Sequence, residues 1–326
     1  MPVLGIESSA HTLGIGIVDN GRILANEKRM YRIDNKGILP MRAAALHTKN
    51  LHSALKRALD KAGLGIRDIE AIGYTKGPGL GPCLEVGMLA ARSIALRYGM
   101  QIFHVNHAVA HIEITSHMCR ACDPLVLYVS GGNSQILAIA DEPYKHYHVY
   151  GETFDIGVGN MLDSFARDAG FKRAWGSEVA SAAVGGSYIS MPYTVKGMDF
   201  AFAGLMTNAV KMLKSHALKD VAYSLQETAF SMLCEATERA LLLTGKRELI
   251  VCGGVAQSAR LQEMLGLVSA GHRARFGVAP NEFNSDNGAM VALVAEKLLR
   301  AGARHRLEDC SVNQKYRVDK VALEWK

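Results

Sequence analysis

The sequence predicts a mixed α/β protein built from two similar halves, with helices covering a sheet in each half. Three observations support this fold class. Strands alternate with helices along the chain, each half opens with consecutive strands joined by short turns, and each half later has a strand followed by a glycine-rich loop and a helix. Hairpins inside a strand–helix alternation indicate sheets with both antiparallel and parallel pairs. The 326 residues are enough for two hydrophobic cores.

The first half is expected to span residues 1–123. Residues 3–29 predict three strands, because two alternating apolar segments meet at the turn Asp19-Asn20-Gly21, a strong hairpin signal. Apolar residues at helical intervals predict a helix over residues 43–62. There follow the strand "IEAIGYT", the loop "KGPGLGP", another helix, the strand "IFHVN" and, at residues 106–114, the segment "NHAVAHIEI".

The second half, residues 124–294, repeats this plan. It opens with strands at "LVLYVS", "ILAIA" and "KHYHVYGE", and continues with a long helix near residues 225–243, the strand "ELIVCGG", a helix from about residue 257 and the strand "ARFGVA". Corresponding places in the halves hold "IGYTKGPGL" and "IVCGGVAQS", as in a duplicated fold. We expect residues 295–326 to pack back on the first half, and a ligand site in a central cleft between the halves.

Composition narrows the class of protein. No apolar run is long enough to cross a membrane and residues 1–13 lack the features of a signal peptide, so we expect a cytoplasmic protein with no membrane partner. Six scattered cysteines argue against a disulfide framework, and the lone pair Cys119 and Cys122 is weak evidence for a metal or redox site. A formal charge of +6 permits a nucleic-acid partner without requiring one.

The turns after the first strand of each half are candidate phosphate-binding loops. In "ESSAHT", which contains Ser9 and His11, and in "SGGNSQ", small residues let backbone N–H groups approach an anion. Each turn alone is more often only a tight connection, so their equivalent positions are what favour a nucleotide. The chain has no Walker sequence and no GxGxxG after its first strand, which argues against P-loop and Rossmann folds.

His107 and His111 lie four residues apart, so on a helix their rings share one face and can bind one metal ion. The pair alone is weak evidence, because a chain with 12 histidines produces this spacing by chance. Ala108 stands where a zinc protease of this pattern has its glutamate. Candidate oxygen ligands are Tyr128 and Asp286, although Asp286 by itself fits a cap of the final helix. Such a ligand set with an open position suits Fe(II) or Zn(II) acting as a Lewis acid.

Nine segments closely resemble, in order, the archaeal and eukaryotic branch of the TsaD family. They are "GIESSAHTLGIGI", "KGPGLGPCLEVG", "NHAVAHIEI", "LYVSGGNSQ", "GETFDIGVGNMLDSFAR", "VKGMDFAFAGL", "SLQETAF", "CGGVAQSARLQEML" and "DNGAM". The resemblance runs from about residue 3 to the end of the chain, and it is specific because HxxxH, YVSGGN and DNGxM occur together. TsaD is the catalytic subunit of the KEOPS complex, which makes threonylcarbamoyladenosine in tRNA.

The resemblance implies an actin-like, sugar-kinase-type (ASKHA) fold of two ribonuclease-H-like lobes. It implies one divalent metal, Fe(II) favoured over Zn(II), held by His107, His111, Tyr128 and Asp286. Threonylcarbamoyl-AMP is the implied substrate, and its acyl group passes to the adenosine 3′ of the anticodon in ANN-decoding tRNAs. The implied partners are tRNA, a Bud-family atypical kinase and a small dimerising subunit. Beyond the metal centre no catalytic side chain is implied.

The resemblance also implies a donor-binding set in the second half. The phosphate and acyl end would lie against Tyr128, Val129, Ser130, Gly131, Gly132 and Asn133, and the ribose and adenine against Asp163 and Gly176. Ser9 and His11 are weaker candidates for a phosphate loop.

The sequence departs from the family pattern mainly on the nucleotide side. The family loop Pro-Gly-Gly-Pro is "AWGS" at residues 174–177, Ala180 replaces a ribose-binding glutamate, and Ser258 replaces an asparagine that meets the adenine. Ala203 replaces a serine before the glycine of "FAGL". In the first half, Met41 and Arg42 replace an acidic residue after Pro40, and Leu46 replaces one of two histidines, of which His47 remains.

Three functions therefore remain open. Losing a carboxylate that holds a ribose hydroxyl removes about 1.5–3 kcal/mol of binding. An active transferase is the first hypothesis, and a paralogue without turnover that serves as a scaffold for tRNA or a partner is the second. A sugar or acetate kinase is allowed by the fold, but the HxxxH pair has no role in phosphoryl transfer.

Overall fold

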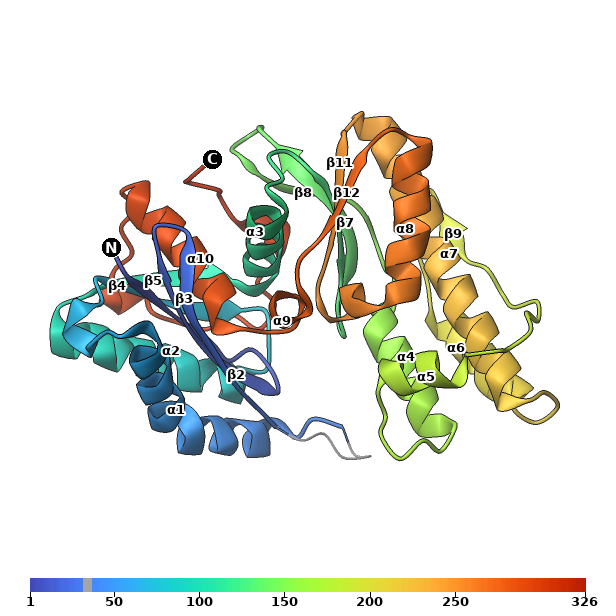
Figure 1. Cartoon of the computed structure of the whole chain (residues 1–326), viewed down its shortest axis with the longest axis horizontal. Coiled ribbons are helices and arrows are strands. Elements are labelled where there is room, and N and C mark those ends of the chain that lie inside the picture. Colours follow the sequence, from blue (N-terminus) through green and yellow to red (C-terminus); the bar gives the residue numbers. More distant parts are fainter. Residues whose placement is uncertain (32–36) are drawn as a thin grey trace. The chain divides into compact units, whose positions relative to one another are not determined.

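A computed structural model describes residues 1–31 and 37–326, which form two compact units (Figure 1). Unit 1 comprises Met1–Ile114, Ala140–Tyr147 and Ser285–Lys326, and unit 2 comprises Thr115–Ile139 and His148–Asn284. These limits differ from the predicted boundaries at residues 123 and 294. The chain enters unit 2 inside a continuous helix, α3 (His107–Cys119), and it returns to unit 1 before the final long helix, α10 (Gly288–Arg300).

The sheet of unit 1 has the strand order β3-β2-β1-β4-β5. The strands are β1 (Val3–Glu7), β2 (Thr12–Asp19), β3 (Arg22–Met30), β4 (Ala71–Gly77) and β5 (Gln101–Asn106). The opening three strands are antiparallel neighbours, whereas β1, β4 and β5 run parallel. Positive φ angles at Asn20 (52°) and Gly21 (72°) give the predicted hairpin turn its geometry.

A row of glycines crosses this sheet beneath α10. Gly5 of β1 pairs with Gly16 of β2 and with Gly73 of β4, so the three lie side by side. A Cβ on Gly16 would lie 2.1 Å from the backbone nitrogen of Ala289, which no real side chain tolerates. Because side chains alternate along a strand, the neighbours Leu4 and Ile6 face the opposite side. The glycines thus let α10 pack directly on the strand backbones.

The opposite side of the sheet carries α1 (Pro40–Ala62) and α2 (Gly81–Tyr98). Its core contains Leu4, Ile6, Leu13, Ile15, Ile17, Ala54, Ala58, Ala91 and Ala95. Both helices end at a glycine in the left-handed conformation, Gly63 and Gly99. The predicted helix over residues 43–62 is confirmed and begins three residues earlier, at a proline that suits a first helical turn.

The sheet of unit 2 has the order β12-β11-β6-β7-β8. Its strands are β6 (Leu125–Val129), β7 (Ser134–Ala140), β8 (His146–Glu152), β11 (Glu248–Cys252) and β12 (Arg275–Val278). As in unit 1, the first strand pairs antiparallel with the second and parallel with the strand that follows the helices. The predicted repetition of one plan is therefore visible in strand order and direction.

The helices of unit 2 are α4 (Val158–Asp168), α5 (Gly176–Ala182), α6 (Ala203–Met212), α7 (Leu218–Thr244), α8 (Ala259–Gly271) and α9 (Asn281–Asn284). A short pair, β9 (Val195–Lys196) and β10 (Asp199–Phe200), precedes α6. The core of this unit packs α4 and α7 against the sheet, with Phe165, Phe200, Phe202 and Phe230 buried in it. Within the described ranges, no helix is long and apolar enough to span a bilayer.

Candidate metal centre and substrate loops

The carboxyl ends of three parallel strands place the polar residues of unit 1. Glu7 ends β1, Thr75 lies near the end of β4, and His107 directly follows β5. Because parallel strands end at the same edge of a sheet, residues distant in sequence become neighbours there. Glu7 is completely buried, and its two oxygens accept hydrogen bonds from the Ser9 N–H (2.6 Å) and the Thr75 hydroxyl (2.6 Å).

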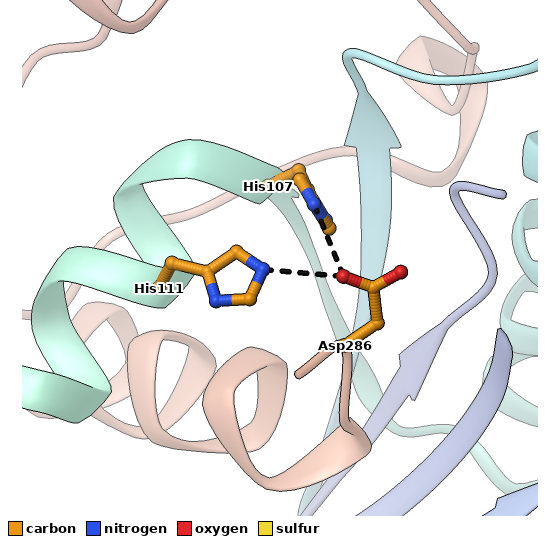
Figure 2. A group of neighbouring side chains, drawn as sticks. All are labelled: His107, His111 and Asp286. Carbon is orange, nitrogen blue, oxygen red and sulfur yellow. Dashed lines mark hydrogen bonds and ion pairs between the residues drawn. The ribbon is translucent and has the colours of Figure 1, made fainter. Parts of the chain in front are cut away.

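His107 and His111 lie in the first turns of α3, as their spacing predicts (Figure 2). The helix starts at His107 because Asn106 accepts a hydrogen bond from the Val109 N–H (3.1 Å), which caps the first turn. The two imidazole rings are 4.7 Å apart between centroids and nearly perpendicular, at 86°. Both side chains point toward Asp286, in the segment just before α10.

One oxygen of Asp286 faces both histidines. Asp286 Oδ1 is 3.6 Å from His107 Nε2 and 3.3 Å from His111 Nε2, and the three ligand atoms lie within 4.8 Å of one another. The alternative role of Asp286 as a helix cap is wrong. Asn287 caps α10 instead, through its side-chain oxygen and the Met290 N–H (2.9 Å). The Asp286 carboxylate is therefore directed at the histidines.

The two separations from Asp286 fit a shared cation. Two ligand atoms each about 2.1 Å from one metal ion lie roughly 3.0–3.4 Å apart in octahedral or tetrahedral coordination. The observed separations of 3.3 and 3.6 Å from Asp286 Oδ1 are close to that range. Imidazole nitrogen and carboxylate oxygen are also a ligand set typical of Fe(II) and Zn(II) sites.

Glu7 also joins this cluster, although its place here was not predicted from the sequence. His107 Nδ1 lies 3.1 Å from Glu7 Oε2 and donates to it, since an ionised carboxylate only accepts. This contact orients the ring and leaves Nε2 for Asp286 or a metal, the arrangement of a carboxylate–histidine–metal triad. A signal was present, because Glu7 closes a strand before the small residues of "ESSAHT".

The charges of this cluster favour a cation. Burial opposes ionisation of Asp286 and Glu7, but the histidines hold the pKa of each carboxyl below its ordinary value. Burial lowers the pKa of His107, but Glu7 and Asp286 outweigh it and raise the pKa to about 9. Burial, with the charge of His107, keeps the pKa of His111 below its ordinary value. At neutral pH two carboxylates thus face one imidazolium and one neutral imidazole.

Tyr128 belongs to unit 2, where it is fully buried on β6 and pairs with Cys252 of β11. Its predicted place among the metal ligands stays a prediction, as does the predicted cleft between the halves.

The predicted phosphate loop of unit 2 is a tight turn between β6 and β7. The Ser130 N–H donates to the Asn133 carbonyl (2.8 Å), and the Asn133 N–H donates to the Ser130 hydroxyl (3.1 Å). The start of α4 packs against this turn, because the Asn160 N–H donates to the Gly131 carbonyl (3.0 Å). A Cβ on Gly157 would lie 2.4 Å from that carbonyl oxygen, so the sequence "GVGN" lets α4 approach. Val129 and Gly132 complete the segment.

Asp163 and Gly176, both predicted to bind the ribose and adenine, lie in contact. Asp163 Oδ1 accepts the N–H of Gly176 (2.7 Å), the first residue of α5. Asp163 lies one turn of α4 after Asn160, so the turn at residues 130–133, Asp163 and the start of α5 follow one face of α4.

Ser9 and His11, the weaker phosphate-loop candidates, lie in the turn between β1 and β2. The Ser9 N–H already donates to Glu7, and the Ser9 carbonyl accepts from the Leu80 N–H (2.7 Å). The His11 carbonyl accepts from the Tyr31 N–H (2.7 Å). These backbone bonds hold the fold of the turn, and the Ser9 N–H is engaged by Glu7. The place of Ser9 and His11 in a phosphate loop stays a prediction.

Comparisons with known proteins agree with this geometry. A model of the TsaD family, tRNA N6-adenosine threonylcarbamoyltransferase, matches residues 22–293. The tRNA N6-adenosine threonylcarbamoyltransferases of Thermococcus sibiricus and Thermococcus kodakarensis are 47% and 45% identical over 328 residues, covering all of each chain. The chain belongs to the TsaD family. The predicted resemblance is confirmed, and full-length identity to named transferases favours an active enzyme over the scaffold.

Other similarities concern the fold and the length of relatives. HypF of T. kodakarensis matches with a TM-score of 0.64 and 13% identity, over 92% of this chain and 48% of that one. An activator of 2-hydroxyisocaproyl-CoA dehydratase from Clostridium difficile matches with a TM-score of 0.54 and 13% identity, over 94% and 99%. The predicted actin-like, sugar-kinase-type fold is confirmed. A probable bifunctional tRNA threonylcarbamoyladenosine biosynthesis protein of Thermoplasma acidophilum is 44% identical, and this TsaD chain spans 61% of it.

Several departures from the TsaD pattern have local structural roles. Ser258 caps α8, since its side chain accepts the Leu261 N–H (3.5 Å). The Ala203 N–H donates to Asp155 (2.8 Å), so the backbone at this position is held without a serine hydroxyl. His47 is fully buried and its Nε2 bonds the Ala10 carbonyl (2.9 Å), whereas Met41 is 72% exposed.

Proposed function

We propose that this TsaD chain transfers the threonylcarbamoyl group from threonylcarbamoyl-AMP to N6 of the adenosine 3′ of the anticodon in ANN-decoding tRNAs. The observation that carries the proposal is the convergence of His107, His111 and Asp286 in a full-length relative of named transferases. The proposed cofactor is one divalent metal, with Fe(II) favoured because two histidines and one carboxylate form the ligand set of many non-haem iron sites. Zn(II) is the alternative.

The bound cation would supply Lewis acidity to polarise the carbamoyl carbonyl. Around it, each side chain has a defined task. Glu7 orients the His107 ring through Nδ1 and stabilises the tautomer that presents Nε2. His111, whose pKa is lowered, stays neutral, so its Nε2 can bind the cation once the proton that Nε2 donates to Asp286 moves to Nδ1. In the transfer, the N6 amine forms the new C–N bond, the bond between the carbonyl carbon and the phosphate oxygen breaks, and N6 loses one proton as AMP leaves.

The donor would bind to unit 2 through the turn at residues 130–133, Asp163 and Gly176, which lie along one face of α4. Backbone groups of that turn suit the phosphate and acyl end, and the start of α5 suits the ribose and adenine. We propose tRNA and the KEOPS-type partners, a Bud-family atypical kinase and a small dimerising subunit, as the assembly in which the chain acts in the cytoplasm. A formal charge of +6 is compatible with tRNA binding.

The test is a reconstituted reaction. The purified chain is combined with its partner subunits, an enzyme that generates threonylcarbamoyl-AMP, and an ANN-decoding tRNA, and nucleosides from the digested tRNA are quantified by mass spectrometry. We expect modified adenosine with the wild type and a loss of at least about 100-fold with Asp286→Asn or His107→Ala, because both remove a metal ligand.

A matched control is Glu296→Gln. Glu296 is a buried carboxylate on α10 that accepts a hydrogen bond from the Gly21 N–H (2.9 Å). It makes no hydrogen bond to His107 or His111. This variant is expected to retain activity per folded molecule. The T. kodakarensis relative, run in parallel, verifies the assay. No product above that of Asp286→Asn, while the relative is active, would reject the proposed function.

A further inference from the structure

Unit 1 contains a second polar cluster, in which the buried Glu113 and Tyr147 meet the partly exposed Lys297 and Lys326. Glu113 lies on α3 and is completely buried. Its Oε2 accepts a hydrogen bond from Lys297 Nζ. Its Oε1 accepts from the Tyr147 hydroxyl and lies 2.9 Å from Lys326 Nζ. Lys326 Nζ also donates to the Tyr147 hydroxyl at 3.0 Å, which closes the cluster.

Stability alone is a poor explanation for this arrangement. Taking the fully buried Glu113 carboxylate out of water costs several kcal/mol, and an apolar residue of similar volume is often at least as stabilising. The lysine side chains keep partial access to water, 27% for Lys297 and 18% for Lys326. What a buried carboxylate with three partners provides is a fixed geometry, because it loses partners if the elements shift. The question is therefore which elements this cluster holds in place.

The cluster joins the two elements that carry the metal ligands. Glu113 is on the same helix as His107 and His111, and Lys297 is on α10, which directly follows Asp286. Helices α3 and α10 are thus linked at two levels, by His111 with Asp286 (3.3 Å) and by Glu113 with Lys297. With 1.5 Å of rise per residue, Glu113 lies about 3 Å along α3 from His111 and about 9 Å from His107, whose Nε2 also faces Asp286 at 3.6 Å. A single contact would let α3 rotate about that point relative to α10. Two contacts also fix the angle between the helices.

The two helices differ in how they are otherwise anchored. The backbone of α10 lies directly on Gly5, Gly16 and Gly73, so α10 cannot move without the sheet. Lys326 is a further partner of Glu113. The segment that carries Lys326 is held by the hydrogen bond from the Leu323 N–H to the Lys145 carbonyl (2.8 Å). The side chain of Glu113 therefore takes its position from α10 and from the segment around Leu323.

We propose that Glu113, clamped by Lys297 and Lys326, is a positioning residue that sets the distance between the two histidines and Asp286 and thereby tunes metal binding. This proposal rests on the metal site of the proposed function. The residues of the clamp touch neither substrate nor metal and act only through α3 and α10.

The test titrates the metal-free chain with Co²⁺, whose visible absorption reports the geometry of its ligands. Lys326→Met removes the ion pair between Lys326 and Glu113, and Glu113→Gln removes the charge at the centre of the cluster. Both are expected to weaken Co²⁺ binding by about 10-fold or more and to change the absorption spectrum, as loss of supporting contacts does in other metal sites. Lys326→Arg, which keeps the charge, should restore most of the affinity.

Glu296→Gln is the matched control, because Glu296 is a buried carboxylate of α10 whose hydrogen bonds go to Gly21 and Arg300 rather than to α3. Urea unfolding of every variant gives its stability. The proposal is wrong if Glu296→Gln and Lys326→Met lose the same stability and also lose the same Co²⁺ affinity. If Glu113→Gln does not fold, the comparison of Lys326→Met with Lys326→Arg decides alone. A wild type that binds no Co²⁺ overturns the metal site and this proposal together, which distinguishes the two failures.

Discussion

Glu7 and His107 form a carboxylate–imidazole pair at 3.1 Å, a hundred residues apart in the chain. The pair gives the His107 ring a carboxylate on each nitrogen, since Nε2 faces Asp286 at 3.6 Å. With a carboxylate at each nitrogen, the protonated ring is held in one orientation, and Glu7 keeps the proton on Nδ1 when Nε2 gives up its own to bind a cation. The candidate metal site is therefore built on the edge of the sheet, and β1, through Glu7, is part of it.

Replacing Glu7 by glutamine should weaken metal binding by about 10–100-fold. Glutamine keeps the shape, but its single carbonyl oxygen cannot accept from Ser9, Thr75 and His107 as the two carboxylate oxygens do. Calorimetry with Zn²⁺ or Co²⁺ measures the change. Unchanged affinity together with a lowered unfolding midpoint would mean that Glu7 only holds the turn after β1.

Features of this site that depend on neighbouring residues could be predicted from the sequence, and contacts between distant residues could not. The spacing of His107 and His111 and the turn Asp19-Asn20-Gly21 are local patterns, and both were predicted correctly. Glu7 was missed because nothing in the spacing of residues 7 and 107 announces that β1, β4 and β5 end side by side. Strand order within a sheet is decided by packing across the whole unit, and a single sequence does not display it.

The alternative that Asp286 caps α10 is wrong for a related reason. Asp286 and Asn287 are adjacent and both are good capping residues, so propensity cannot choose between them. The choice is made by the backbone that leads into α10, which sits on the glycine row. Asn287 then reaches the Met290 N–H, and Asp286 turns to the histidines. The glycines themselves were visible, as "VLGIE" and "TLGIGIVD", but their partner helix was not.

Gly16→Ala should destabilise the chain by about 3 kcal/mol, at the upper end for overpacking, because its Cβ would lie 2.1 Å from the Ala289 backbone. The shift of α10 should also displace Asp286 and lower Co²⁺ affinity. The matched control is Gly266→Ala in α8, where no atom lies within 4 Å of the new Cβ. That variant should gain roughly 0.5–1 kcal/mol from helix propensity. Urea unfolding measures both, and equal stability of the two variants would contradict the role of the glycine row.

His104 should make the fold sensitive to acid. Its ring stacks on His305 at 3.8 Å, and burial, with the charges of His305 and Lys76, lowers its pKa to about 3. The unfolded chain binds a proton at this residue near pH 6.5 and the folded chain only near pH 3. Folded stability is therefore lost as pH falls from 6.5 towards 3.

The variant His104→Phe keeps a ring for stacking and removes this proton uptake. Between pH 7 and pH 4.5 it should lose less stability than the wild type, by on the order of 1–2 kcal/mol after solvent screening. Unfolding by urea at the two pH values gives the difference, in which the other histidines cancel. Parallel losses in the two proteins would show that His104 is protonated in the fold as easily as in the unfolded chain.

Ala180→Glu should strengthen binding of AMP by about 10–100-fold, the value of roughly 1.5–3 kcal/mol for a hydrogen bond to a charged group. Ala180 is half-buried on α5, the helix whose first N–H is held by Asp163 (2.7 Å), and family members have a ribose-binding glutamate at this place. Calorimetry with AMP measures the gain, and Ala180→Gln separates the effect of charge from that of size. Because α5 starts from a fixed point on α4, a carboxylate one turn later needs no rearrangement of the loop at Trp175. Equal AMP affinity of the wild type and Ala180→Glu would place the ribose elsewhere than beside α5.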